Sequence, residues 1–178
     1  MDPFLGFIED SAVSNWIRGS DSLFAFPAII TLHTIGMGFL AGGSAAIDLR
    51  ILGFAPALSL KAMGRFLPLL WLAFAVNAVS GLLLLVAYPT KALTNPVFYL
   101  KVCLIALAVW LVHHIGRTVL RAPDAGQSTL PDSLPSPLPG HARWLALTSL
   151  AAWIALITAG RLLAYTHRWE LLGVPALT

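Results

Sequence analysis

The chain has 178 residues, of which 58% are hydrophobic and 11% carry a charged side chain. Soluble domains are typically about 45–50% apolar and about 25% charged, so this composition excludes a soluble globular protein. Segments of bilayer length and a mean hydropathy of +0.82 predict an all-α integral membrane bundle of about four spans. The net charge of +3 comes from Lys and Arg residues spread over segment ends, which indicates membrane anchors and excludes nucleic-acid binding.

Residues 3–18 predict an amphipathic helix that lies on the membrane surface, since their apolar side chains fall close to one helical face. The N-terminus is acidic and lacks the basic segment of a cleavable signal peptide, so we expect the first span to be retained. That span covers residues 22–48. A connection over 51–65 then follows the interface as a short amphipathic piece, and the second span covers 66–88.

The third span covers residues 96–121, and Asn95 followed by Pro96 is typical of a helix cap and first turn. Residues 122–140 are rich in proline and serine and predict an exposed linker. The fourth span covers 142–166. The first and third connections carry more Lys and Arg than the segments on the other side, which favours both termini outside the cytoplasm.

His33 is the first informative polar residue, because it lies well inside the first span, in TLHTIGMGFLAGG. Ionisable residues inside a membrane are functional candidates, here for a cofactor or proton role, and the alternative is a structural hydrogen bond to a neighbouring helix. The glycines after it, which include Gly36, Gly38, Gly42 and Gly43, favour close helix packing. A bulky flat cofactor such as haem is the alternative occupant of that space.

His113 and His114 lie towards the far end of the third span. Adjacent helical residues diverge by about 100°, so at most one of these histidines can point directly into the bundle. His113, Arg117 and Arg121 share one stripe, which is suited to haem propionates or lipid phosphates or is a plain interfacial cluster. The axial offset between His33 and His113 is about 13 Å for untilted helices. Therefore either tilt absorbs it, or there are two sites, or His33 has another partner.

Arg161 places a guanidinium inside the fourth span, towards the same side as His33. A charged guanidinium is costly at that depth, so we expect it to have a partner unless the side chain snorkels to the interface. The candidate partners are a haem propionate, a quinone carbonyl, a lipid phosphate or helix-end carbonyls. We expect Asn77 to form an interhelical hydrogen bond and Cys103 to be a small buried hydrophobic residue. No hydrolase or phosphoryl-transfer motif is present in the sequence.

Four segments carry a family resemblance: TLHTIGMGFLAGGSAAIDLRILG, RFLPLLW, TNPVFYLKVCLIALAVW and AGRLLAYT. Over about residues 16–166 the chain resembles an uncharacterised bacterial family of four-helix integral membrane proteins. It is more remotely similar to the copper-resistance D and b-type cytochrome membrane proteins. The positions that match the family motifs are His33, Asp48, Leu49, Arg50, Asn95, Pro96, Phe98, Lys101, Gly160 and Arg161. The family's glutamate before the histidine is missing, since Ile30 and Thr31 stand there. The resemblance implies that the protein lies in a bacterial inner membrane. The charge distribution predicts that both termini face the periplasm.

The remote resemblance and the polar residues together predict an integral membrane electron-transfer subunit that binds haem b and links the quinone pool to a partner redox protein. His33 would be the first axial ligand and His113 or His114 the second. Arg117 would contact a haem propionate, and Arg161 a propionate or a quinone. Expected partners are membrane lipids, other subunits of a membrane redox complex and a cytochrome. The alternative is a cofactor-free scaffold or accessory subunit of a larger respiratory or photosynthetic complex. Three Met and one Cys argue against copper handling.

Overall fold

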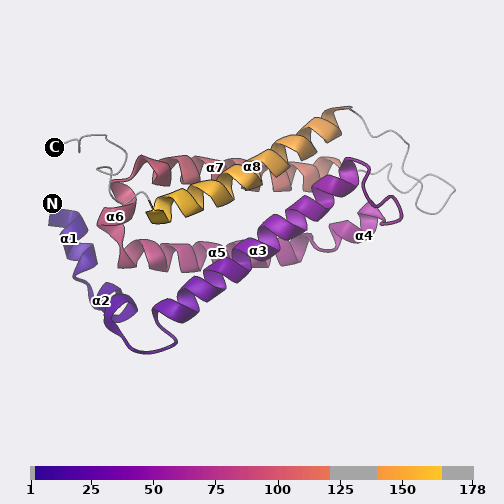
Figure 1. Cartoon of the computed structure of the whole chain (residues 1–178). Coiled ribbons are helices and arrows are strands. Elements are labelled where there is room, and N and C mark those ends of the chain that lie inside the picture. The colour runs from indigo at the N-terminus through magenta and orange to yellow at the C-terminus, as the bar shows by residue number, and fades with distance from the viewer. Residues whose placement is uncertain (1–2, 121–139, 166–178) are drawn as a thin grey trace.

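The computed structural model describes residues 3–120 and 140–165, and within these ranges the chain is helical without strands (Figure 1). Four helices are long and apolar enough to cross a bilayer. They are α3 (Phe26–Ile51), α5 (Leu67–Ala87), α7 (Pro96–Thr118) and α8 (Gly140–Tyr165). The predicted fold class, an all-α multi-pass membrane protein, is therefore confirmed.

The first span is shifted relative to its predicted range of 22–48. Helix α3 begins only at Phe26, because the preceding residues form a turn and Pro27 needs no hydrogen-bond partner in the first turn. It continues three residues past the predicted end, to Ile51. Helix α7 ends at Thr118, before the predicted end at 121. Of the predicted linker, residues 122–139 lie outside the described residues and residue 140 begins α8.

The bundle is built around α3, which packs against both α5 and α8, while α7 packs mainly on α8 (Figure 1). Helix α5 reaches α7 near Gly116, where an added Cβ would come 3.3 Å from Cδ1 of Leu67. The core contains apolar side chains from all four helices. They include Leu40, Ile47, Leu70, Ala73, Ala108, Ile115, Ala146 and Trp153. Close packing of small residues and leucines is the expected source of cohesion inside a bilayer.

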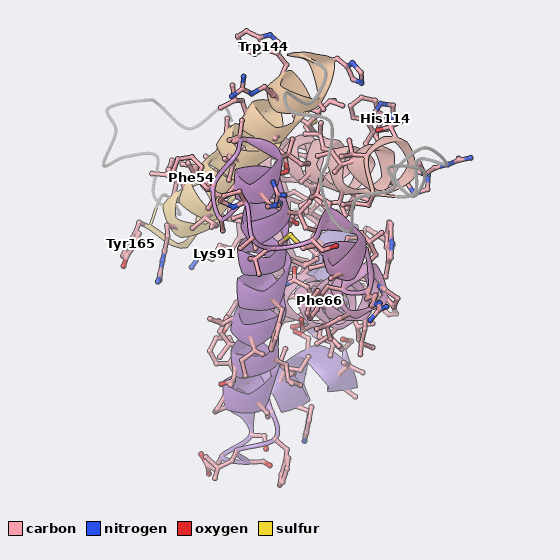
Figure 2. All side chains as sticks on the ribbon, turned by 90° about the vertical axis from the view of Figure 1, so that its right-hand side faces the viewer. Phe54, Phe66, Lys91, His114, Trp144 and Tyr165 are labelled. Atoms are coloured by element: carbon pink, nitrogen blue, oxygen red, sulfur yellow. The ribbon has the colours of Figure 1, made fainter. Side chains whose placement is uncertain are left out.

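The outer surface of the long helices is apolar as well. Viewed from the right-hand end of Figure 1, Trp144 and Tyr165 project outward from α8, and Phe66 lies at the start of α5 (Figure 2). These three side chains are exposed, as are many leucines along the spans. A soluble protein would not expose so much apolar surface, so the helices suit contact with membrane lipids.

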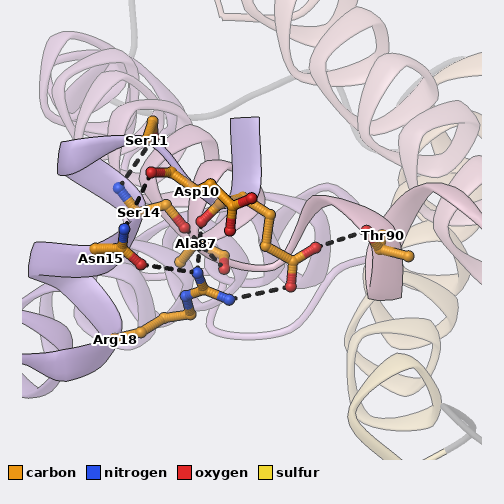
Figure 3. A network of polar contacts seen from close by, with 8 residues as sticks. Asp10, Ser11, Ser14, Asn15, Arg18, Ala87 and Thr90 are labelled. Atoms are coloured by element: carbon orange, nitrogen blue, oxygen red, sulfur yellow. Dashed lines mark hydrogen bonds and ion pairs between the residues drawn. The ribbon is translucent and has the colours of Figure 1, made fainter. Parts of the chain in front are cut away.

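The predicted surface helix over 3–18 is two helices, α1 (Pro3–Glu9) and α2 (Ala12–Gly19). The break occurs because Ser11 caps α2, its hydroxyl accepting a hydrogen bond from the Ser14 backbone N–H. Glu9 joins the segments, since its carboxylate pairs with Arg18 and accepts a hydrogen bond from the Thr90 hydroxyl of α6 (Pro89–Leu93) (Figure 3). Buried Ile17 and Ser14 anchor α2 at the end of α5.

The loop after α3 is held by Arg50, whose side chain is buried. Its Nε–H donates to the Leu58 carbonyl and its Nη2 to the Pro56 carbonyl. This loop leads into the short helix α4 (Leu60–Gly64), which occupies part of the connection expected at 51–65. Arg50 therefore holds the loop in place by donating hydrogen bonds to two of its backbone carbonyls.

Replacing Arg50 by alanine should destabilise the protein by about 1.5–3 kcal/mol, because two carbonyl oxygens lose a charged donor. Unfolding by SDS in mixed micelles would measure the loss. The matched control is Arg143→Ala, at an exposed position of α8, for which we expect a change within about 0.5 kcal/mol. Equal effects of the two substitutions would contradict the role given to Arg50.

Candidate functional site

His33 is fixed by helix α5. Its Nδ1 lies 3.1 Å from the Asn77 backbone oxygen and 3.1 Å from the Ser80 hydroxyl. The carbonyl oxygen can only accept, so Nδ1 carries the imidazole proton and donates it to Asn77. The Ser80 hydroxyl donates back to the Val76 carbonyl at 2.7 Å, and the Asn77 side-chain amide donates to the His33 backbone oxygen at 2.7 Å. The predicted interhelical role of Asn77 is thus present.

The other ring nitrogen of His33, Nε2, has no hydrogen bond among the described residues. With Nδ1 protonated, this nitrogen offers a lone pair. The ring lies close against α5, where a Cβ added at Gly81 would come 3.1 Å from Cε1 of His33. The imidazole is half-buried. The result is an oriented histidine whose Nε2 is available as an acceptor or ligand when the ring is neutral.

Two cationic residues lie at the same level of the bundle as His33. Lys101 of α7 is half-buried and near enough for its charge to act on the imidazole. Arg161 lies on α8, which runs antiparallel to α3, and Ser149 of α8 lies beside Asp48 of α3 near the other end. Counting along both helices from that contact places Arg161 level with Gly36, about one turn from His33. The Arg161 side chain is exposed. Within residues 3–120 and 140–165 the one ion pair joins Arg18 and Glu9, so neither cation is neutralised by a carboxylate there.

His113 and His114 lie elsewhere. The His113 ring packs edge-on against Trp71 of α5 at 6.3 Å between centroids, and its side chain is exposed. His114 stacks on Trp110 at 5.1 Å and lies on the outside of α7, away from α3 and α5 (Figure 2). Arg117 is exposed as well, and Arg121 lies outside the described residues.

The two histidine groups therefore do not form one clamp. His33 meets α5 at Asn77 and Ser80, whereas His113 meets it at Trp71. These positions are about 9–14 Å apart along α5 at 1.5 Å per residue, which agrees with the expected offset. A single iron held by His33 and by His113 or His114 does not fit this arrangement. Tilt of the helices therefore does not absorb the offset, and two separate sites or a different partner for His33 remain as the alternatives.

The glycines of α3 divide into two sets. Gly36 is pressed against the backbone of α5 at Ala73, and Gly43 against Leu70, so these two serve close helix packing. Gly38 and Gly42 face open space and line a groove of about 490 Å³ between α3 and α5. Gly38 lies about 140° around the helix from His33, so this groove is separate from the imidazole.

Cys103 is exposed, and its predicted burial is wrong. Lipid is as apolar as a protein core, so an uncharged helix does not reveal which of its faces is covered. The described residues contain no group of three or more His, Cys, Asp or Glu side chains that could hold a metal ion.

Known proteins give no further guide. Comparison with protein-family models, with curated proteins and with solved structures found no match to this chain. The family resemblance seen in the sequence stays a prediction. Sequence reasoning also missed Ser80 and Gly81, although their spacing of three and four residues from Asn77 places all three on one side of α5.

Proposed function

We propose that this chain is an integral membrane electron-transfer subunit in which His33 supplies an axial ligand to haem b. The observation that carries the proposal is the state of the imidazole, with Nδ1–H donated to the Asn77 carbonyl and Nε2 unpartnered. Histidines that ligate iron typically donate their other ring N–H to a carbonyl or carboxylate, which fixes the tautomer and the ring plane.

The surrounding residues fit this role in part. Lys101 and Arg161, at the level of His33, supply positive charge suited to propionate groups. When bound, the haem would supply one-electron chemistry, and the protein would orient it and tune it through burial and hydrogen bonds. His113 and His114 do not fit as the second ligand, so a partner subunit would supply it. His33 is only half-buried, so part of the residue remains accessible to such a partner.

A second candidate function is a cofactor-free accessory subunit of a larger membrane complex. The groove over Gly38 and Gly42 favours it, because small residues on an outer helix face allow another membrane helix to approach closely. In that case His33 would only join α3 to α5. The same position could also bind a quinone. The quinone would accept a hydrogen bond from Lys101, and the reduced quinol would donate one to Nε2 of His33.

The test is a visible spectrum of the chain purified in mild detergent with its co-purifying subunits. The dithionite-reduced minus air-oxidised spectrum should show the α and β bands of a b-type cytochrome. A featureless spectrum from folded protein with its partners present would overturn the haem proposal and favour the accessory subunit.

A further inference from the structure

The groove beside the exposed glycines of α3 lies on the outer surface of the bundle, where α3 passes α4 and the start of α5. Its volume is about 490 Å³, and its lining residues are glycines or carry apolar side chains. Small residues of α3 line one side, and larger exposed side chains flank it. These are Gly38, Gly42 and Ala46 on the one hand and Phe39, Phe66 and Leu69 on the other.

The groove reaches from one end of the spans to their middle. Met63 and Phe66 line its near end, at the junction of α4 and α5. Its far end lies at Gly38, 13 residues before α3 ends at Ile51, which is about 20 Å along the helix axis. Ile35, one turn earlier, is a large exposed residue and does not line the groove. A bilayer with its headgroups is about 40–45 Å thick, so the groove has about the depth of one leaflet.

A positive charge lies at the near end of the groove. Arg65 stands between Met63 and Phe66 in the sequence, is the C-cap of α4 and is exposed. The connection over residues 51–66 contains Lys61 as a second cation and no Asp or Glu. Among the residues that the structure describes, no carboxylate pairs with Arg65. A cation in this position at a membrane surface attracts anionic lipid headgroups.

The depth and the charge of the groove together favour one occupant. A transmembrane helix packs along the whole hydrocarbon thickness of about 30 Å, whereas this groove extends over about half of the bilayer. An acyl chain extends through a single leaflet and needs only apolar contacts. The phosphate of the same lipid then lies at the interface, on the level of Arg65.

We propose that this groove binds one anionic phospholipid, with an acyl chain along Gly38, Gly42 and Ala46 and the phosphate on Arg65. The two glycines have open space where a side chain would stand, so the chain can approach the helix closely. Gly38 and His33 lie on different faces of α3, about 140° apart, so this site is independent of the haem proposal.

The experiment is native mass spectrometry of the full chain, stripped of lipid in a neutral detergent and offered equimolar phosphatidylglycerol and phosphatidylcholine with the same acyl chains. One phosphatidylglycerol per chain should stay bound in preference to phosphatidylcholine. Arg65→Gln should lower the affinity for phosphatidylglycerol about fivefold, the change expected for one cation near anionic headgroups. The matched control is Arg143→Gln, at an exposed arginine of α8 at the same end of the bundle, which should leave the affinity unchanged.

Gly42→Leu tests the apolar part of the site. A Cβ added at Gly42 meets nothing within 4 Å, so leucine occupies the groove while the helices keep their places. This variant should lose the preferentially bound lipid. Gly160→Leu is its control, because an added Cβ there also meets nothing and the residue does not line the groove.

The wild-type protein tests the proposal even where a variant fails to fold. Equal retention of the two lipids by the wild type would overturn it, as would unchanged retention in Arg65→Gln or in Gly42→Leu. A wild-type chain that retains no lipid but forms a dimer, and becomes monomeric in Gly42→Leu, would overturn it in favour of a membrane helix from a second copy.

Discussion

His33→Ala should abolish the reduced α and β bands while the protein remains helical and inserted in detergent. The reason is that the described residues offer no other unpartnered imidazole fixed between two spans: His113 is exposed and His114 is stacked on Trp110. Loss of the axial ligand removes the iron bond, whereas loss of the Nδ1 contacts removes only hydrogen bonds to Asn77 and Ser80. The measurements are the reduced-minus-oxidised spectrum and the haem content per chain.

His113→Ala and His114→Ala are the matched controls, since each removes an imidazole from α7 without touching the His33 site. Both should keep the bands at wild-type intensity. Ser80→Ala should keep haem as well but shift its reduction potential, because a group that orients the ligand alters its basicity. Bands that survive in His33→Ala and vanish in either α7 variant would contradict the assignment of the ligand.

The spans could be predicted because their signal is one of length and charge. A bilayer requires uninterrupted apolar segments, and Asn95 and Pro96 mark the start of α7 at the residue where the structure begins it. The N-terminal helix could be predicted as amphipathic but not as broken. The break depends on the Ser11 cap and on Glu9 reaching Arg18 and Thr90, a contact between segments far apart in sequence.

The candidate sites were harder to predict, because they depend on which helix faces meet. His33 could be singled out by its depth, but its partners on α5 depend on the crossing of two helices. The glycines of α3 stood out as a segment of small residues, but nothing in the pattern indicates that Phe66 and Leu69 at the start of α5 flank a groove beside them. In lipid the apolar residues carry no information on facing, so hydropathy cannot supply it.

Gly36→Val is expected to have the largest effect on stability of any glycine substitution in α3. A Cβ at Gly36 would come 3.2 Å from the Ala73 backbone oxygen and 3.3 Å from Cβ of Asn77. Neither atom is the end of a flexible side chain, so α3 and α5 must move apart. By contrast, a Cβ at Gly43 meets the mobile tip of Leu70. We expect a loss of about 1–3 kcal/mol, measured by SDS unfolding in mixed micelles.

Gly38→Val is the matched control, because it makes the same change of residue two positions away, where a Cβ meets nothing within 4 Å. Its effect should lie within about 0.5 kcal/mol. The pair separates the two interpretations of the glycine segment. If Gly36 provides close packing, its substitution destabilises the protein in haem-free preparations as well. If it provided space for a cofactor, the substitution would lower haem content and leave the haem-free protein as stable as before.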